Sequence, residues 1–440
     1  MTRMTRLSAT RTPLGLAALL SSVLLAACGS MSPSATSPAV PASPTVSVKV
    51  LAINDFHGNL VPPAAGIKIS DPQHPGKQIT LQAGGAERMA TVVSQLRAAN
   101  PNHAFIAAGD LVGASPLLSA LFHDEPTIES LGMMGLEYAA VGNHEFDNGL
   151  PELLRKQNGG CHPTSGCTGP SPFTGARYQY LAASTWDIAA NKTVLPAYRI
   201  KRFEGVPVAF IGLTLKGTPG LISPTAAAGM RFDDEAETVN RLVPELQRQG
   251  VNAIVVMIHE GGYPTGEYDE CPGISGPIVD IVKKMDKAVG LVVSGHTHRA
   301  YNCRIDGRLV TSGDKYGTIV SEIDLQLDRA SGRMTEARAQ NLIVRMETPK
   351  DPAQTALIAS YERLAAPLIN RDVGHIAAPF PKEEDSAGGG TTMGQLVADA
   401  MLAATAVPSQ GGAQVAMTNV GGVRTGLILR SDGRVNFGDL

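Results

Sequence analysis

Five short clusters of His, Asp, Asn and Glu residues carry the side chains in this sequence that could do chemistry. They are, in chain order, Asn54-Asp55-Phe56-His57-Gly58, Gly109-Asp110, Gly142-Asn143-His144-Glu145-Phe146-Asp147, His259-Glu260-Gly261-Gly262 and Gly295-His296-Thr297-His298. Carboxylate and imidazole groups together bind divalent ions. One aspartate can bridge two ions through its two oxygens, and an asparagine adds a neutral amide oxygen. The clusters therefore predict a metal site.

Each cluster by itself also has a purely structural interpretation. A Gly-Asp pair is usually a turn, and an Asp-x-His pair is more often hydrogen-bonded than metal-bound. The His296 and His298 pair is more specific, although two histidines in a turn can simply be a surface loop. Glu145 and Glu260 are expected to be scaffold residues. The prediction of a metal site therefore rests on the five clusters occurring in this order, each after an expected strand.

The elements that must position these clusters alternate between strands and helices. Strands are expected at 46–53, 103–108, 138–141, 253–258 and 290–293, each followed by one cluster, and helices at 86–99, 127–134, 234–249 and 275–285. This alternation indicates a parallel sheet, which later strands at 309–312, 318–327 and 338–345 extend in antiparallel fashion. Active sites of open α/β sheets form at the carboxyl ends of the strands. We therefore expect all five clusters to meet at one rim.

The ordered set resembles the calcineurin-like metallophosphoesterases, and within them the secreted 5′-nucleotidase family, which includes periplasmic enzymes that also cleave UDP-sugars. Further support comes from the segments Gly109 to Pro116 (GDLVGASP) and Val141 to Gly149 (VGNHEFDNG). The resemblance implies an α/β fold, a β-sandwich flanked by helices in four layers (αββα). Its expected parts are a metallophosphoesterase domain at 47–348, a connector helix at 349–371 and a truncated α+β substrate domain at 372–440.

The same resemblance implies a site for two divalent ions, with Zn, Mn, Mg, Co and Fe all left open. The expected ligands are Asp55, His57, Asp110 and His298 for one ion, and Asp110, Asn143, His259 and His296 for the other, with Asp110 as the bridge. His144, paired with Asp147, would be the catalytic histidine. The alternative role for His144 is to support a ligand. The implied reaction is attack on phosphorus by a hydroxide that the ions activate.

The C-terminal part contains a possible substrate loop, Asn419-Val420-Gly421-Gly422-Val423-Arg424, after an expected helix at 391–406 and strand at 414–418. Alone, this is a glycine turn with a surface arginine. It resembles the start of the 5′-nucleotidase C-terminal domain, which implies that Asn419, Gly421, Gly422 and Arg424 contact the nucleotide. We expect the chain to stop before the aromatic residues that hold the base, which would leave the metal site complete and the nucleotide site incomplete.

The N-terminus has the features of a processing signal. Arg3, Arg6 and Arg11 precede an apolar run that ends in Leu25-Ala26-Ala27-Cys28, which resembles the lipobox of bacterial lipoproteins. This implies a signal peptide at 1–27, lipid on Cys28, and a Ser/Pro/Ala-rich tether at 28–46. An ordinary signal peptide is the alternative. The expected location is the bacterial cell envelope, anchored to a membrane through Cys28 and facing the periplasm, with the outer membrane favoured.

The remaining cysteines suit an exported protein. Cys161, Cys167, Cys271 and Cys303 allow three pairings, of which we expect Cys161 with Cys167 and Cys271 with Cys303.

Charge and the resemblance together bound the function. A net charge of −3 without a basic stripe argues against a nucleic-acid polymer as partner. The expected function is release of phosphate from nucleoside 5′-monophosphates, with UDP-sugars and 2′,3′-cyclic nucleotides as further candidates. The alternatives are a general metallophosphodiesterase and a lipoprotein that binds nucleotide or metal without turnover. The oligomeric state stays open.

Overall fold

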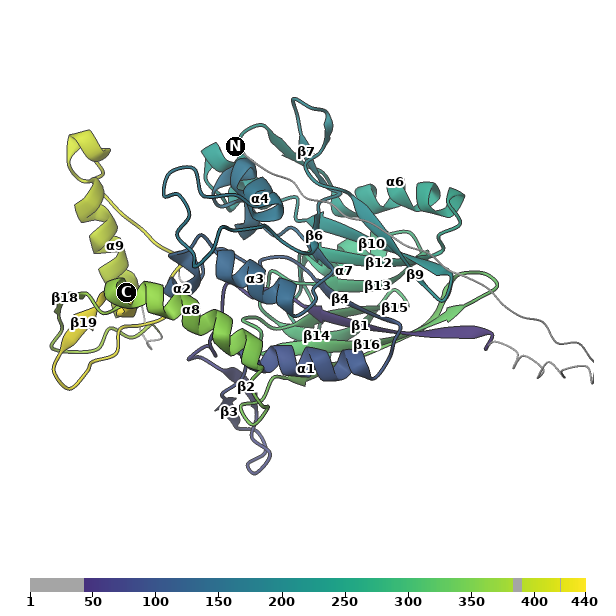
Figure 1. Cartoon of the computed structure of the whole chain (residues 1–440), viewed down its shortest axis with the longest axis horizontal. Helices are drawn as coiled ribbons and strands as arrows, with labels where there is room; N and C mark the ends of the chain where they lie inside the picture. The colour runs from purple at the N-terminus through teal and green to yellow at the C-terminus, as the bar shows by residue number, and fades with distance from the viewer. Residues whose placement is uncertain (1–42, 383–389, 420) are drawn as a thin grey trace, which may run out of the picture. The chain divides into compact units, whose positions relative to one another are not determined.

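Strand β1 (Thr45–Ile53) shows how the sequence builds the centre of the fold (Figure 1). The computed structural model describes residues 43–382, 390–419 and 421–440, so the expected signal peptide and Cys28 lie outside the described residues. Val48 and Val50 point to one face of β1, whereas Leu51 and Ile53 point to the other. Both faces are apolar because both are covered, as expected for the interior of an α/β fold.

Two mixed six-stranded sheets form the body of the molecule. Their strand orders are β17-β16-β1-β4-β5-β6 and β14-β15-β13-β12-β10-β9. Besides β1, the first sheet contains β4 (His103–Ala107), β5 (Tyr138–Ala140), β6 (Gln179–Leu181), β16 (Ile319–Asp328) and β17 (Met334–Ile343). The second sheet contains β9 (Tyr198–Phe203), β10 (Val206–Thr214), β12 (Ala253–His259), β13 (Val289–Ser294), β14 (Ala300–Ile305) and β15 (Arg308–Gly313). Strands β1, β4, β5 and β6 pair in parallel, as do β10, β12, β13 and β15, which confirms the expected parallel sheet. Strands β16 and β17 extend the first sheet antiparallel, as expected, and β9 and β14 are the antiparallel edges of the second. The strand expected at 309–312 to extend the sheet antiparallel, β15, instead pairs in parallel with β13 and antiparallel only with β14.

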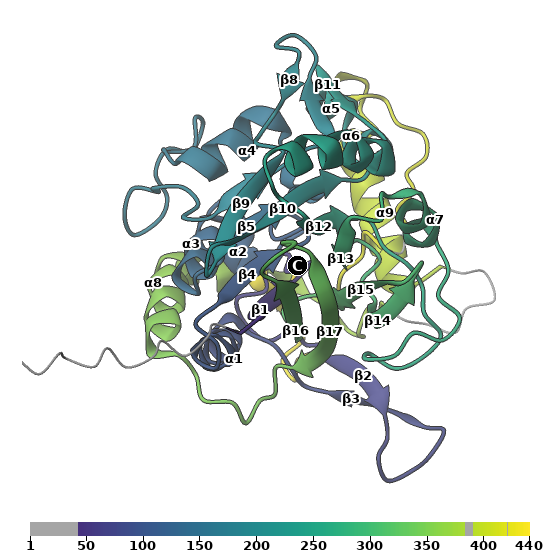
Figure 2. The ribbon, with the colours of Figure 1, turned by 90° about the vertical axis from the view of Figure 1, so that its right-hand side faces the viewer.

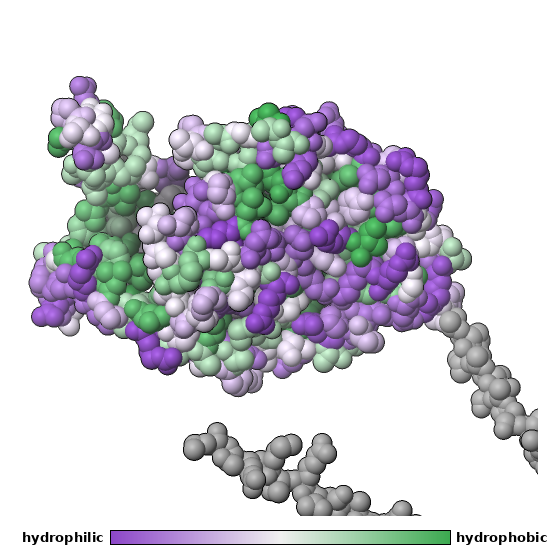
Figure 3. Space-filling view, turned by 45° about the horizontal axis from the view of Figure 1, so that its top comes forward, coloured by the Kyte–Doolittle hydropathy of each residue, from purple (hydrophilic) through white to green (hydrophobic). Residues whose placement is uncertain are grey.

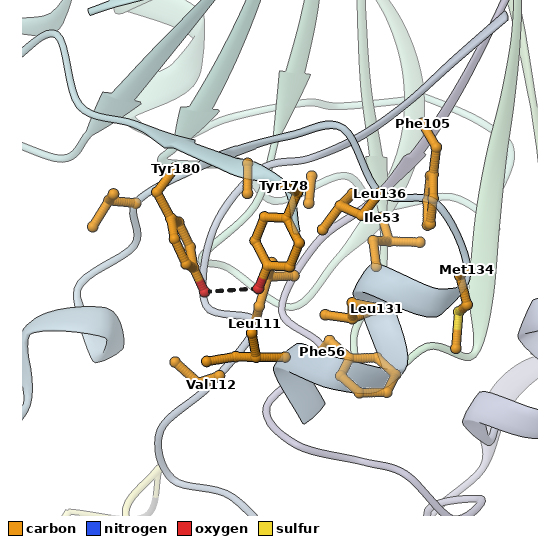
Figure 4. Close-up of a cluster of buried hydrophobic side chains, with 14 of the residues drawn as sticks. Ile53, Phe56, Phe105, Leu111, Val112, Leu131, Met134, Leu136, Tyr178 and Tyr180 are labelled. Carbon is orange, nitrogen blue, oxygen red and sulfur yellow. Dashed lines mark hydrogen bonds between the residues drawn. The ribbon is translucent and has the colours of Figure 1, made fainter. Parts of the chain in front are cut away.

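The sheets pack face to face and helices cover their outer faces, which gives the four layers that the resemblance implies (Figures 1 and 2). Val50, Ile106, Phe210 and Val255 belong to the apolar layer between the sheets. Helices α1 (Ala86–Ala98), α3 (Glu125–Met133) and α4 (Gly149–Asn158) cover the first sheet, and α6 (Glu235–Arg248) and α7 (Pro277–Lys284) cover the second. Figure 4 shows part of the cluster beneath α3, where the hydroxyls of Tyr178 and Tyr180 are 3.2 Å apart.

Helix α8 (Pro352–Ile369) follows the sandwich where a connector is expected. The Asp351 side chain caps its first turn by accepting a hydrogen bond from the Gln354 amide. Gln354 in turn is buried and bonded to Ser130 of α3 through its side-chain amide. These contacts fasten the start of α8 to the first sheet's helical layer.

The C-terminal part is small and leaves apolar side chains exposed. It contains β18 (Asp372–His375) paired with β19 (Arg434–Asn436), and α9 (Thr392–Thr405). The strand expected at 414–418 is wrong: no strand forms there, and among the described residues none pairs with it. Val415 and Met417 are 72% and 83% exposed. Figure 3 shows apolar surface gathered on this part.

The remaining elements are short, and two disulfides tie down loops. They are β2 (Ile67–Ser70), β3 (Gln78–Leu81), β7 (Thr185–Asp187), β8 (Lys192–Thr193), β11 (Met230–Phe232), α2 (Leu117–Ala120) and α5 (Pro224–Ala227). Cys161 is bonded to Cys167 and Cys271 to Cys303, the pairing expected from the sequence. None of the helices in the described part of the chain combines the length and apolar character needed to cross a membrane.

Replacing Phe210 by alanine tests the layer between the sheets. The Phe210 side chain is fully buried beside Tyr138, so Phe210→Ala should lower the free energy of unfolding by about 3–5 kcal/mol. The exposed Arg338→Ala on β17 is the control and should change it by less than about 0.5 kcal/mol. Urea unfolding measures both, and equal effects would contradict a core at this position.

Candidate metal centre

All five clusters lie where strands of the two sheets end. Three clusters follow strands of the first sheet: Asp55 and His57 come after β1, Asp110 after β4, and Asn143 and His144 after β5. In the second sheet, His259 is the last residue of β12, and His296 and His298 follow β13. The first three strands belong to one sheet and the last two to the other. The rim expected from the sequence therefore forms, and it is built across the sandwich.

The side chains gather into two groups, each with its potential ligand atoms within 4.8 Å of one another. One group is Asp55, His57 and His298, and the other is Asp110, His259 and His296. In the first group, His298 Nε2 lies 3.1 Å from His57 Nε2 and 3.5 Å from Asp55 Oδ1. In the second, His259 Nε2 lies 3.0 Å from Asp110 Oδ2, and Asn143 Oδ1 is 3.2 Å from the same nitrogen.

The Asp110 carboxylate lies between the two groups. Its Oδ2 is 3.0 Å from His259 Nε2 and 3.7 Å from His57 Nε2. Its Oδ1 accepts a hydrogen bond from the His144 amide at 2.9 Å. A single carboxylate thus reaches both groups, which is the position that a bridging ligand requires.

Backbone carbonyls set the orientation of two of the imidazoles. His57 Nδ1 is 2.8 Å from the carbonyl oxygen of Gly113, and His259 Nδ1 is 2.8 Å from that of Ala108. Because a carbonyl only accepts, each Nδ1 carries a proton, so Nε2 is the nitrogen that faces the centre and that offers a lone pair to a metal ion when the ring is neutral. Metal-binding histidines in proteins are usually held in this way. The donor set fits divalent ions that take both nitrogen and oxygen ligands.

The electrostatics of the centre also suit a cation. Burial opposes charge on His259, but the charge and hydrogen bond of Asp110 outweigh burial and raise the pKa of His259 to about 10. Burial lowers the pKa of His57 to about 3. Burial opposes ionisation of Asp110 as well, yet the nearby histidines lower the pKa of this carboxyl. The buried carboxylates therefore stay charged and attract positive charge, which divalent ions would supply.

The backbone is strained at most of the expected ligands. Five of them have a left-handed φ: Asp55 (49°), His57 (45°), Asp110 (48°), His296 (68°) and His298 (54°). Each such residue costs about 1–3 kcal/mol and persists only where the surrounding structure fixes it. The packing of the fold therefore offsets this strain and holds these side chains in place at the centre.

Two glycines allow the loops to approach closely. A Cβ atom at Gly142 would lie 2.1 Å from Asp110 Oδ1, and one at Gly109 would lie 2.7 Å from His259 Nδ1. Any side chain at either position would displace an expected ligand.

Glu145, expected from the sequence to be a scaffold residue, holds two of these loops together through contacts that the sequence did not specify. Its buried carboxylate accepts backbone hydrogen bonds from Asp110 (3.0 Å), Leu111 (2.8 Å) and Gly142 (2.7 Å). Burial, followed by the charge of Asp110, raises the pKa of Glu145 to about 7. Its scaffold role is to fix the Asp110 turn against the turn that carries Asn143 and His144.

His144 and Asp147 form a pair at the edge of the centre. His144 Nδ1 is 2.8 Å from Asp147 Oδ2, and the two side chains are 24% and 34% exposed. Burial lowers the pKa of His144, but the hydrogen bond to Asp147 and the charge of Asp110 reverse this, so the net shift is upward. A ligand atom of His144 also lies within 4.8 Å of those of His57 and Asp110, so the geometry leaves its role as a metal ligand open as well.

The expected substrate residues are only partly brought to this rim. Arg424 Nη1 lies 3.5 Å from the Tyr316 hydroxyl, beside the first ligand group. The Asn419 side chain instead accepts a hydrogen bond from the Gly422 amide at 2.7 Å and so closes its own turn. Gly421 is exposed. Arg424 is therefore the one of these four residues with a contact at the metal centre.

Replacing Glu145 by glutamine tests its structural role. Glutamine keeps one acceptor oxygen but points an NH₂ group at backbone N–H donors. Glu145→Gln should therefore lower the free energy of unfolding by about 1–3 kcal/mol and reduce bound metal. The exposed Glu336→Gln is the control. Urea unfolding and elemental analysis measure both effects, and unchanged stability would contradict the assignment.

Comparison with known proteins agrees with this geometry. Residues 48–300 match the family described as Calcineurin-like phosphoesterase. Endonuclease YhcR of Bacillus subtilis is 31% identical over 404 residues, 90% of this chain and 31% of the endonuclease. A 5′-nucleotidase of Vibrio cholerae is 27% identical over 63% of this chain and 46% of its own length. This chain thus spans less than half of either relative.

The solved structures agree on the fold. The 5′-nucleotidase precursor of Thermus thermophilus superimposes with a TM-score of 0.63 at 21% identity, covering 83% of this chain and 68% of that one. The relative and the solved structure named 5′-nucleotidase are consistent with this family. Because the family match covers more than half of its residues, the chain belongs to the calcineurin-like phosphoesterases, a family of metal-dependent phosphoester hydrolases.

Proposed function

We propose that this chain is a phosphohydrolase of the 5′-nucleotidase type, which uses two divalent ions to release phosphate from nucleoside 5′-monophosphates. The observation that carries the proposal is the Asp110 carboxylate between two ligand groups, with the His144–Asp147 pair beside it. Relatives named 5′-nucleotidase support the substrate class. UDP-sugars and cyclic nucleotides are further candidate substrates.

The residues of the chain divide the work of this reaction. Two bound ions would activate water and neutralise phosphoryl charge. The expected ligands would hold the ions at fixed positions, and Asp110 would set their separation. Asp147 accepts a hydrogen bond from His144 Nδ1 and so directs the other ring nitrogen away from itself. There the imidazolium would stabilise the charge that grows on the phosphoryl and leaving oxygens. Arg424 would contact phosphate through its guanidinium fork.

A second candidate function is general phosphodiester cleavage. It is favoured by one observation, the relative named an endonuclease that matches 90% of this chain. A net charge of −3 weighs against a polymeric nucleic acid as the substrate, because such binding sites are usually strongly basic. Small diesters are therefore the relevant alternative, and a direct comparison of monoester with diester separates the two.

Phosphate release from AMP by the soluble chain from Ser30 to Leu440 tests the proposal. Release should require added Mn²⁺ or Zn²⁺ and stop with chelator. Bis-nitrophenyl phosphate is the diester control. Faster cleavage of the diester than of AMP would favour the second candidate. No metal-dependent release from either ester would contradict both.

Replacing His144 by alanine tests the catalytic pair. His144→Ala should lower kcat by about 10²–10³-fold, because charge stabilisation at the transition state is lost, while metal content stays unchanged. Elemental analysis of the purified variant gives the metal content. Loss of metal together with activity would instead make His144 a ligand.

We also propose that the chain is anchored in the bacterial cell envelope through lipid on Cys28, facing the periplasm. The supporting observation is the sequence Leu25-Ala26-Ala27-Cys28 after a positively charged start and an apolar run. Expressed in a bacterium, the full chain should sediment with membranes, whereas Cys28→Ser should not. Ser30→Ala is the control. Equal sedimentation of all three would contradict a lipid anchor at Cys28.

A further inference from the structure

The loop between β15 and β16 is tied directly to the metal centre. The Tyr316 amide donates a hydrogen bond to the carbonyl oxygen of Asp55 at 2.7 Å. The Asn54 side chain donates to the carbonyl oxygen of Asp314, also at 2.7 Å, and the Thr318 hydroxyl donates to the Asp314 carboxylate at 3.1 Å. The loop therefore has one fixed position relative to the first ligand cluster.

Tyr316 has a strained backbone in this loop. Its φ is 59°, in the left-handed region that five of the expected ligands also occupy. This conformation is a rare one for a bulky residue. Strain of this kind concentrates at functional sites because the surrounding contacts there must enforce one geometry. The next residue, Gly317, has φ 67° and lies against the Phe56 ring, where a Cβ would be 2.9 Å away, so the loop has little room to relax.

The Tyr316 ring lies beside the first ligand group. Its centroid is 5.9 Å from that of His57 and 5.7 Å from that of His298, both in edge-to-face geometry. The residue is only partly buried, so a bound molecule can reach it. The ring also has positive charge nearby: the Arg424 guanidinium 3.5 Å from its hydroxyl and the Lys315 ammonium 5.6 Å from its centroid.

We propose that Tyr316 is a substrate-binding residue whose hydroxyl donates a hydrogen bond to a non-bridging oxygen of the phosphate group. The proposal rests on the phosphohydrolase function proposed above and adds a residue to it. The Arg424 guanidinium can only donate, so Tyr316 Oη is the acceptor in their contact. The phenol proton is then available for another acceptor, and a phosphoryl group held at the first ligand group would lie next to the Tyr316 ring, which contacts His57 and His298. Donation from Arg424 also strengthens the phenol as a donor.

A purely structural role for Tyr316 makes a different prediction. If the ring only packs against His57 and His298, phenylalanine should replace it without effect on phosphate, because the ring is kept. If the hydroxyl binds phosphate, Tyr316→Phe should weaken phosphate binding and raise KM for AMP about tenfold. It should leave kcat nearly unchanged, because the hydrogen bond forms in both the bound substrate and the transition state.

Calorimetric titration of inorganic phosphate into the Mn²⁺-loaded chain measures this directly and needs no turnover. Tyr316→Phe is compared with the wild type and with Tyr198→Phe, a control that loses a hydroxyl bonded to Glu245 on the far side of the second sheet. Metal content and thermal unfolding of each variant are measured alongside. In the double variant with Arg424→Gln, the two losses should be less than additive because the side chains act on the same group.

The expected result is phosphate binding about tenfold weaker in Tyr316→Phe alone, at unchanged metal content. Equal affinity in Tyr316→Phe and the wild type, whether both bind or neither does, would overturn the role of Tyr316. Weakened binding accompanied by loss of metal would overturn it as well, since the residue would then act by supporting His57 or His298. A wild type that binds phosphate but releases none from any ester would contradict the phosphohydrolase, while the titration still decides on Tyr316.

Discussion

The Asp110 carboxylate is buried between imidazoles that come from both sheets, and the arrangement of the site depends on it. Its Oδ2 faces His259 and His57, and its Oδ1 accepts the His144 amide. A buried carboxylate is stable only when cations and hydrogen-bond donors surround it. Each group that satisfies Asp110 lies at the end of a different strand, so the two sheets must be stacked with their strand ends aligned for the charge to be accommodated.

The sandwich provides that alignment through ordinary packing. Side chains that alternate along β1, β10 and β12 fill the layer between the sheets on one side and the helical layers on the other. A rigid apolar body of this kind can support strained loops at one end, because the strain at five expected ligands and at Tyr316 is small compared with the burial beneath them. Glu145 and the close approach at Gly142 then fix the loops against each other.

The similarity to known phosphoesterases and the geometry of the site explain different features of this protein. The family match accounts for the sandwich and the clusters at its rim. Because this chain spans less than half of its nucleotidase relative from Vibrio cholerae, the nucleotide substrate stays a proposal, supported by the names of relatives and by the grouping of side chains at the rim. Beside the first ligand group, the guanidinium of Arg424 lies within 3.5 Å of the Tyr316 hydroxyl.

The sequence by itself determined which residue types stand at the strand ends and the alternation of strands and helices, because these follow from local periodicity. It allowed three pairings of the four cysteines, and the fold shows the expected one, Cys161 with Cys167 and Cys271 with Cys303. It did not determine the contacts of Glu145, whose acceptor role depends on turns that meet only in the fold, or of Tyr316, which touches Asp55 from a distant part of the chain. It also predicted a strand at 414–418 that does not form, since β propensity is realised only where a neighbouring strand offers hydrogen bonds. The spacing of the clusters did not by itself determine how the side chains group. The family resemblance implied a grouping, and the tertiary structure brings those side chains together because it sets which strands lie side by side.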